Sequence, residues 1–370
     1  MTKLHEKFTF PNGATIQNRL VMAPMTTYSG HDHGEVSEAE CAYYSVRARD
    51  VGMVITGTTF TLRNGQGFPN QFYAGCDKHL HGLANLATAI KADGAKAILQ
   101  VFHAGRMVRP GLLKESEVVS ASDVPAERED ALTPRPLRDE EVDDIIESFA
   151  ATTKRAIEAG FDGVEVHGAN TYLIQQFYSP HSNRRNDRWG GTRDKRMRFP
   201  LAVTRAVLAT VKRHAPRDFI VGYRMSPEEL ENPGLTLEDN LALADSLSDL
   251  PLDYLHLSLR QFNQTSLRDR ADDRLIAGRF KSTLAGRLPL IGVGSVLTIE
   301  DALSALEAGF DLVALGSVMI ADPSAAGRIL RGESPHFKVT SAIRAERFIP
   351  PNLFEVMLTR PIDPRLSFEH

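Results

Sequence analysis

The sequence has few cysteines, no long hydrophobic run and no excess of positive charge, and each absence excludes a class of protein. The 370 residues include only Cys41 and Cys76, too few for a disulfide scaffold and at no common metal spacing. No run of about 18 uninterrupted apolar residues predicts a membrane-spanning helix. The net charge of −4 gives no electrostatic footprint for nucleic acid. The N-terminus lacks the basic-then-apolar pattern of a secretory signal, so we expect a cytoplasmic protein.

What is present favours one large folded unit. Hydrophobic residues make up 42% of the chain, which excludes disorder as a general description. Short runs rich in Val, Ile and Leu, typical of buried parallel strands, occur at 19–25, 51–59, 95–103, 161–168, 219–226, 253–259, 288–295 and 311–317. Stretches with helical spacing lie between them, at 78–92, 139–159, 193–214, 237–249, 298–308 and 323–331. This alternation predicts an α/β fold, a single-domain (β/α)8 TIM barrel, with an open doubly wound sheet as the competing architecture.

Two connections are longer than the others. Residues 104–138 follow the third predicted strand, and residues 171–192 follow the fourth. Because loops after the strands of such a barrel line the active site, these two predict lids or substrate walls. We expect residues 1–335 to form the barrel and residues 336–370 to form a C-terminal extension that packs on it or on a neighbouring subunit. No linker indicates a second independent domain.

Polar residues follow most of the predicted strands, at the end where barrel active sites lie. Beside an apolar barrel such side chains are unfavourable unless they are hydrogen-bonded or face a ligand. The residues at this rim are Thr26, Thr58, Gln100, His103, His167, Asn170, Tyr172, Arg224, Ser295 and Ser317.

The last two predicted strands end in small residues, GVGS (292–295) and LGS (315–317). Backbone amides at such positions can approach an anion, and the loops after strands seven and eight of this barrel often hold phosphate. A single Gly-Ser pair would indicate only a turn. Two pairs at consecutive strand ends favour a phosphate site over two simple turns.

The segment HGANTY (167–172) concentrates chemistry. If it were helical, the spacing of three would place His167 and Asn170 on one side, each able to donate a hydrogen bond to the same oxygen. Tyr172 could deliver a proton nearby. The alternative is a strand-end histidine that caps a carbonyl group. His, Asn and Tyr form a poor ligand set for zinc, so we expect no metal.

Four segments together carry a family resemblance over roughly residues 4–330. They read VMAPMTTY (21–28), LQVFHAGR (99–106), VEVHGANTYLIQQFYSPHSNRRNDRWGGTRDKRMRF (164–199) and YRMS (223–226). The chain resembles the old yellow enzyme family of FMN-dependent ene-reductases, and within it the bacterial NADH-dependent flavin oxidoreductases. The resemblance implies a TIM barrel that binds FMN and takes hydride from NADH or NADPH. It implies that flavin N5 passes the hydride to the β-carbon of an activated alkene, such as an α,β-unsaturated carbonyl compound.

The resemblance also implies a role for each matching residue. His167 and Asn170 would hold the carbonyl oxygen of the substrate, Tyr172 would donate the proton, and Tyr28 would contact the substrate. Two such preorganised donors stabilise developing enolate charge by a few kcal/mol. Gln100 would bond the pyrimidine edge of the flavin by donating and accepting at once. The FMN-binding residues implied are Ala23, Pro24, Met25, Thr26, Thr58, Gln100, Arg224, Gly294, Gly316 and Ser317.

The chain departs from the family at the phosphate. Where the family has Gly-Arg, this sequence has Gly316-Ser317, which loses a charge-assisted hydrogen bond. Lys281 or Arg328 could replace that charge. Arg344 and Arg347 of the tail could reach a neighbouring site, and we expect a homo-oligomer.

Two other functions compete with the ene-reductase. One is a non-redox barrel lyase or isomerase that binds a phosphorylated substrate at the same rim. The other is a protein that binds a flavin or another ligand without turnover.

Overall fold

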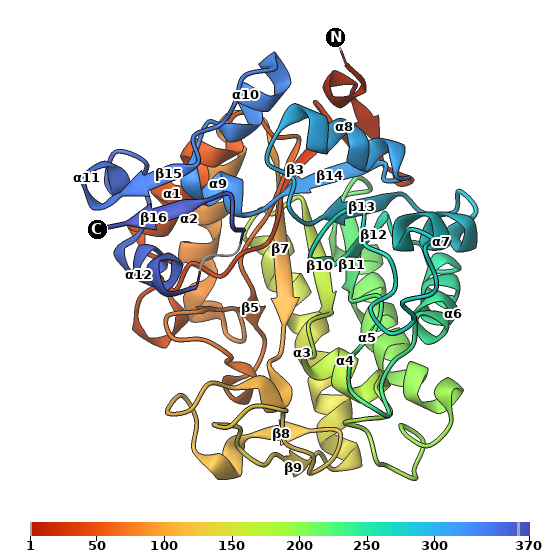
Figure 1. Cartoon of the computed structure of the whole chain (residues 1–370). Coiled ribbons are helices and arrows are strands. Elements are labelled where there is room, and N and C mark those ends of the chain that lie inside the picture. The colour runs from red at the N-terminus through yellow and green to blue at the C-terminus, as the bar shows by residue number, and fades with distance from the viewer. Residues whose placement is uncertain (1, 361–362) are drawn as a thin grey trace.

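The computed structural model describes residues 2–360 and 363–370, and its centre is a closed barrel of eight parallel strands (Figure 1). In order around the barrel these are β3 (Leu20–Met22), β4 (Met53–Ile55), β7 (Lys96–Phe102), β10 (Gly163–Gly168), β11 (Ile220–Met225), β12 (Tyr254–Leu257), β13 (Leu290–Val293) and β14 (Leu312–Leu315). β14 pairs with β3, and β10 pairs with β7, which closes the ring. All eight predicted strands and the TIM barrel are confirmed, and the open sheet is excluded.

Helices cover the outside of the barrel between successive strands (Figure 1). They are α1 (Glu38–Ala48), α2 (Leu80–Lys91), α3 (Asp139–Glu158), α5 (Arg193–His214), α6 (Leu237–Ser248), α7 (Ile276–Leu284), α8 (Ile299–Glu307) and α10 (Ala325–Arg331). The six predicted helical stretches all hold a helix. α7 was not among them, because it begins after Leu275, which offers no capping side chain, and carries Gly278 in its first turn.

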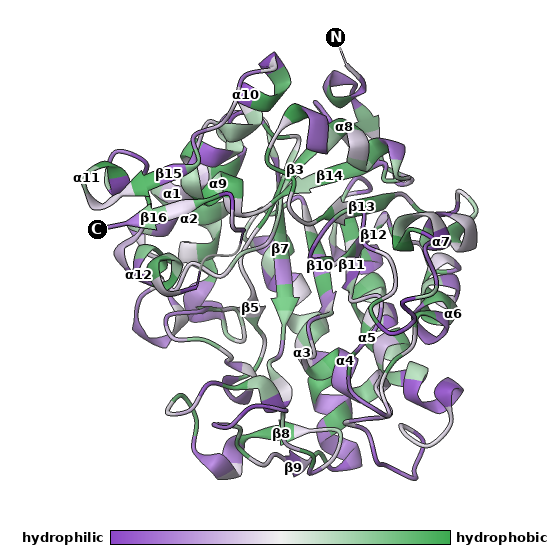
Figure 2. Cartoon of the chain, in the orientation of Figure 1, coloured by the Kyte–Doolittle hydropathy of each residue, from purple (hydrophilic) through white to green (hydrophobic). Residues whose placement is uncertain are grey.

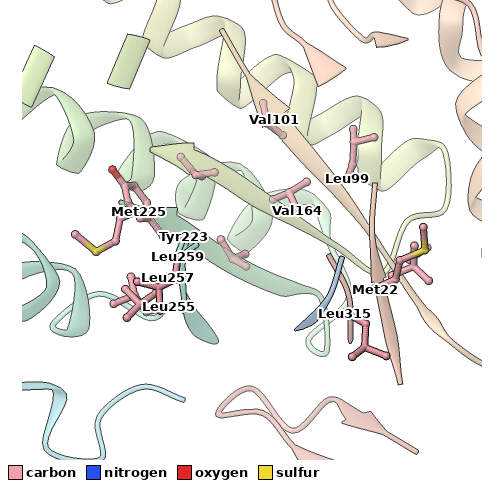
Figure 3. Close-up of a cluster of buried hydrophobic side chains, with 14 of the residues drawn as sticks. Met22, Leu99, Val101, Val164, Tyr223, Met225, Leu255, Leu257, Leu259 and Leu315 are labelled. Atoms are coloured by element: carbon pink, nitrogen blue, oxygen red, sulfur yellow. The ribbon is translucent and has the colours of Figure 1, made fainter. Parts of the chain in front are cut away.

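Successive residues of the barrel strands face opposite sides of the sheet. Outward-facing residues such as Leu99, Val101, Val164, Tyr223 and Leu255 pack with the helices in the main core (Figure 3). A second cluster fills the interior and consists mainly of Val21, Met53, Ile55, Ile98, Ile220, Tyr254, Ile291 and Leu312. It also includes residues of the N-terminal hairpin β1 (Phe8–Thr9) and β2 (Thr15–Ile16), which packs against the interior. Figure 2 shows hydrophobic residues along the barrel strands and hydrophilic residues on many outer loops. The alternation of successive residues along each strand therefore determines which of them point into the barrel.

The two long loops after the third and fourth barrel strands are confirmed, and both contain structure. The loop after β7 carries the short parallel pair β8 (Val119–Ser120) and β9 (Arg135–Pro136), which lies beyond the end of the barrel toward which β7 points (Figure 1). The loop after β10 contains α4 (Leu173–Tyr178), a fully buried helix that the sequence did not predict. The loop after β4 adds β5 (Thr59–Phe60) and β6 (Phe72–Tyr73) beside β7. Single turns of 3-10 helix occur at Lys3–His5, Asp32–Gly34, Arg63–Gly65, Asp77–His79, Gly105–Met107 and Glu115–Glu117.

The tail packs on its own barrel. After α9 (Ser317–Ala321) and α10 it forms β15 (Lys338–Thr340), α11 (Ser341–Arg344), α12 (Pro351–Thr359) and β16 (Ser367–Glu369), with β15 paired to β16. Leu353, Phe354 and Met357 of α12 are buried in the main core. Arg344 donates to the carbonyl of Ile349, and Arg347 donates to those of Ala321 and Lys338. Both guanidinium groups thus bind carbonyls of their own chain. The division of the chain into a barrel of residues 1–335 and a C-terminal extension of residues 336–370 remains a proposal.

None of the helices in the described residues has the length and apolar character that a membrane-spanning segment needs.

Candidate active site

A cavity of about 860 Å³ opens at the carboxyl ends of the barrel strands. This volume lies in the range of small-molecule and cofactor sites. The predicted site residues that line it are Ala23, Pro24, Met25, Asn170, Arg224, Gly294, Ser295, Gly316 and Ser317. They come from five different strand ends, so the closed barrel brings together residues that are far apart in the sequence.

The loop after β12 was missing from the predicted rim and contributes a large part of the cavity wall. Its lining residues are Ser258, Leu259, Arg260, Gln261, Gln264 and Leu267. Asp363 and Pro364 of the tail also line the cavity. Ser258 and Leu259 end the predicted run 253–259, so applying to this run the strand-end rule used for the other strands would have found this loop.

A polar layer lies inside the barrel beneath the cavity, around the fully buried carboxylate of Glu165. Gln100 Nε2 donates to Glu165 Oε1 (2.6 Å), and the hydroxyl of Tyr254 donates to Oε2 (3.0 Å). His256 Nδ1 lies 2.9 Å from Oε2. Gly222 of β11 pairs in register with Glu165. Arg224, the next inward-facing residue of β11, lines the cavity. The layer therefore connects the barrel interior to the cavity.

The charges of this layer follow from its contacts. Burial alone would raise the pKa of Glu165, but His256, Arg224 and Gln100 outweigh it and hold the pKa below its ordinary value. Burial, aided by the charge of Arg224, lowers the pKa of His256 despite Glu165. We therefore assign a carboxylate to Glu165 and a neutral imidazole to His256 that donates from Nδ1.

Three buried polar atoms of the layer lack partners within the described chain, Gln100 Oε1, Arg224 Nε and His256 Nε2. Gln100 is fully buried, and one of its amide hydrogens is committed to Glu165. Because buried polar atoms in folded proteins are nearly always paired, the unpartnered atoms indicate a bound polar group. Arg224 lines the cavity, whereas Gln100 does not.

The side chain of His167 is nearly fully buried, and its contacts determine its charge and which ring nitrogen carries the hydrogen. The backbone N–H of Ala169 donates to His167 Nδ1 (3.2 Å), so Nδ1 is an acceptor and Nε2 carries the hydrogen. Burial, with the nearby charge of Arg224, lowers the pKa of His167 well below its ordinary value. The imidazole is therefore neutral and acts as a donor through Nε2.

Asn170 lies in a turn rather than in a helix, so the helical reason for placing it on one side with His167 is wrong, and Tyr172 is the N-cap residue of α4. Asn170 and Thr171 have φ values of 58° and 61°, a left-handed conformation that is unusual for threonine. The backbone N–H of Asn170 donates to Ser226 Oγ (2.8 Å), which fixes the turn to the next strand end. Asn170 is thereby exposed on the cavity wall, whereas His167 lies in the barrel layer beside Arg224.

Tyr172 packs on the aromatic side of the site. Its ring lies edge-on to Phe102 and His167, with centroids 4.5 Å and 5.1 Å away. Burial raises the pKa of the phenol, and the charge of Arg109 only partly opposes this. The hydroxyl makes no hydrogen bond within the described residues and stays protonated at neutral pH.

Tyr28 joins the same aromatic wall through Phe68. The rings of Tyr28 and Phe68 meet edge-on at 5.7 Å, and Phe68 approaches Tyr172 at 6.3 Å. The guanidinium of Arg109 lies 5.3 Å from both the Tyr28 and Phe68 rings and donates to the Tyr28 hydroxyl (3.1 Å). Arg109, which was not predicted, brings a positive charge to this wall.

Thr26 and Thr58 adjoin a smaller cleft beside the cavity. Their hydroxyl oxygens are 3.4 Å apart, and Gln71 Nε2 donates to Thr58 Oγ1 (2.7 Å). Since Thr58 accepts from Gln71, it can donate to Thr26, which leaves the hydroxyl hydrogen of Thr26 free for a ligand. His103 does not line the cavity. Burial lowers the pKa of His103 to about 3, and its Nδ1 accepts from the backbone of Gly105.

Neither cation predicted to replace the missing arginine reaches Gly316 and Ser317. Lys281 is paired with Asp311 (2.6 Å), which precedes β14 and so lies at the opposite end of that strand. Arg328 is paired with Asp322 (3.2 Å) and does not line the cavity. Both expectations are therefore wrong, because each charge is already neutralised within the chain.

The residues present fit the FMN that the resemblance implies. One end of the cavity has Arg224, and the polar layer beneath the cavity holds the unpartnered acceptor of Gln100. The other end has Gly294, with a φ of 128°, and Ser317. A ring with hydrogen-bonding edges suits the first end, and an anion suits the second. In the ranges 2–360 and 363–370, no group of three or more His, Cys, Asp or Glu side chains could hold a metal ion.

Comparison with known proteins agrees with this site. The model of the NADH:flavin oxidoreductase / NADH oxidase family matches residues 3–334. The probable NADH-dependent flavin oxidoreductase YqiG of Bacillus subtilis is 44% identical over 329 residues, which cover 89% of this chain and 88% of that protein. The NADH:fumarate oxidoreductase of Klebsiella pneumoniae is 43% identical over 359 residues, 96% of this chain and 39% of that protein. The chain thus spans about two-fifths of the length of the latter relative.

Solved structures agree on the fold. The old yellow enzyme homologue from Zymomonas mobilis superposes with a TM-score of 0.81 at 23% identity, covering 95% of this chain and 98% of that one. The resemblance found in the sequence motifs is thereby confirmed at the level of the family and the barrel.

Proposed function

Because the chain belongs to the NADH:flavin oxidoreductase / NADH oxidase family, and is an oxidoreductase that uses FMN and a nicotinamide reductant, we propose that it reduces the activated C=C bond of a small α,β-unsaturated carbonyl compound. One observation carries the proposal. Two neutral hydrogen-bond donors and a protonated phenol come from the end of β10 and the residues directly after it: Asn170 lines the cavity, His167 lies in the barrel layer beside Arg224, and the ring of Tyr172 packs 5.1 Å from that of His167. A non-redox lyase or isomerase has no support from the family match.

His167 and Asn170 bind the carbonyl oxygen of the acceptor in this proposal. Bound FMN supplies the two-electron carrier that takes hydride from the nicotinamide and delivers it to the β-carbon. Negative charge then develops on the carbonyl oxygen, where the His167 Nε2–H and the Asn170 amide stabilise it. Because the histidine is neutral and fixed by Ala169, it donates a hydrogen bond without a change in its own protonation.

Tyr172 donates the proton that completes the reaction. The α-carbon gains this proton and the β-carbon gains the hydride, so the C=C bond becomes a C–C single bond. Its raised pKa keeps the phenol protonated through the neutral range, ready to act as an acid. Tyr28 belongs to the same substrate wall.

The cofactor residues are assigned as the sequence resemblance implies. We place Ala23, Pro24, Met25 and Thr26 along the flavin ring, with Thr58 supporting Thr26. The positive charge of Arg224 would favour negative charge on the reduced flavin ring, and Gln100 would accept a hydrogen bond from the ring. Gly294, Gly316 and Ser317 would hold the phosphate.

An unsaturated carboxylate is the second acceptor class. Arg109 has no carboxylate partner within the described residues, and it lies over the aromatic wall near Tyr172. A guanidinium at this position can bind a carboxylate. One relative is named for fumarate, and fumarate therefore belongs in the acceptor panel.

Product analysis with an acceptor panel tests the proposal. The FMN-loaded protein is supplied with NADH or NADPH and with cyclohexenone, acrylate, fumarate, a quinone or a nitro compound. We expect saturated products from the alkenes. Oxidation of the nicotinamide without any saturated product from the whole panel would contradict the proposal.

A further inference from the structure

Arg260 lines the cavity with a positive charge and has no role in the substrate and cofactor contacts proposed so far. Among the lining residues in the part of the chain that the structure describes, the cationic side chains are Arg224 and Arg260. Arg224 stands on β11 beside the buried polar layer, at the end assigned to the flavin ring. Arg260 stands on the loop after β12, at the end that contains Gly294 and Ser295.

The backbone around Arg260 is locked to the loop after β13. Ser295 Oγ donates to the carbonyl oxygen of Arg260 (3.2 Å), and the N–H of Phe262 donates to the carbonyl of Gly294 (3.0 Å). A Cβ atom at Gly294 would lie 2.8 Å from the carbonyl carbon of Arg260 and 2.7 Å from the nitrogen of Gln261. The chain therefore approaches Gly294 so closely that only glycine fits, which places Arg260 beside the predicted phosphate loop.

The guanidinium of Arg260 makes no ion pair or hydrogen bond in residues 2–360 and 363–370. Its backbone N–H is used by Gln264 Oε1 (3.2 Å), and its side chain is exposed. The other nearby cation, Arg365, is paired with Asp301 (2.9 Å) and Asp363 (3.2 Å). Arg260 is thus the charge at this end that is available for an anion.

We propose that Arg260 supplies the charge-assisted contact to the FMN phosphate that Ser317 cannot supply. The proposal rests on FMN occupying this cavity. Ser317 offers one neutral hydroxyl, whereas a guanidinium offers a full charge and a planar set of donors matched to phosphate oxygens. The charge has moved from the loop after β14 to the loop after β12. The protein should consequently distinguish FMN from riboflavin through Arg260.

The test compares the affinities of the flavin-free chain for FMN and for riboflavin, measured by quenching of flavin fluorescence. Arg260→Ala should weaken FMN binding roughly 10- to 100-fold, the range for a lost charged hydrogen bond, and leave riboflavin binding unchanged. High salt should weaken FMN binding by the native chain more than by the variant. Arg217→Ala is the matched control, because this exposed arginine precedes β11 at the other end of the barrel, and it should change neither affinity.

Two further variants separate charge from loop shape. Arg260→Lys should retain part of the preference for FMN. Adding Ser317→Arg to Arg260→Ala should restore FMN binding by returning the charge to the position usual in the family. Unchanged FMN affinity in Arg260→Ala, or equal losses for FMN and riboflavin, would overturn the proposal. Flavin binding is read without turnover, so failure of alkene reduction would not affect this result. A native chain that binds neither flavin would overturn the cofactor assignment and this proposal together.

Discussion

Tyr172→Phe removes one oxygen atom from the site and little else. The phenol makes no hydrogen bond within the described chain, so its loss leaves no buried partner unsatisfied. The ring contacts with Phe102 and His167 remain available to phenylalanine. We therefore expect the free energy of unfolding to change by less than about 0.5 kcal/mol.

The catalytic effect of the same change should be confined to one half-reaction. A positioned acid contributes about 10²- to 10⁴-fold to a rate, equivalent to about 3–5 kcal/mol of barrier. Rapid mixing should show reoxidation by cyclohexenone slowed by this factor and reduction by NADH nearly unchanged. Because the pKa of Tyr172 is raised, the native rate of reoxidation should not fall through loss of this proton between pH 6 and 9. Equal slowing of both half-reactions, or of neither, would remove Tyr172 from the role of proton donor.

Three other changes probe separate parts of the site. His167→Ala should weaken the binding of phenols, which mimic an enolate, and unaltered phenol affinity in a flavin titration would count against the donor pair. Glu165→Gln should lower the free energy of unfolding by about 3 kcal/mol, since it leaves Arg224 without its buried counter-charge, and urea unfolding with no change would contradict this. Burial raises the pKa of Glu40 from 4.5 to about 7, so the native state keeps this proton longer than the unfolded chain. Stability should then fall by about 3 kcal/mol as pH rises from about 4.5 to above 7. Glu40→Gln should flatten that slope in urea unfolding at several pH values, and an identical slope would refute the assignment.

The barrel could be predicted because its strands repeat one local pattern. Each run is short, apolar and followed by a turn, and four of the helices between them begin with a capping Ser or Thr side chain, as α8 does at Thr298. α4 and α7 escaped prediction for physical reasons. α4 is only six residues long and is held by burial on all sides, and α7 combines the lack of a capping side chain with Gly278 in its first turn.

The site could be predicted only where its residues end a strand. The search for polar residues at strand ends located Arg224 and Asn170. It passed over Glu165 and His256, which stand inside strands and face inward. A signal for them exists in VEVHG and LHL, where polar residues take every second position of an apolar strand.

Long-range pairing was the remaining obstacle. The ion pair between Lys281 and Asp311 joins a residue that precedes β13 in the sequence to one that follows it, and no local pattern in the sequence reveals this pairing. The locking of the loop after β12 onto Gly294 likewise depends on the distance between two strand ends, which only the closed barrel fixes.

Anaerobic rapid mixing of the two half-reactions decides whether the reduced flavin passes its electrons to an alkene. The FMN-loaded protein is first bleached with one equivalent of NADH or NADPH and then mixed with cyclohexenone, acrylate or fumarate. We expect flavin absorption to return as one equivalent of the saturated product forms. A flavin that is reduced by the nicotinamide and stays reduced with every alkene, while oxygen or a quinone restores its colour, would show that the protein is not an alkene reductase.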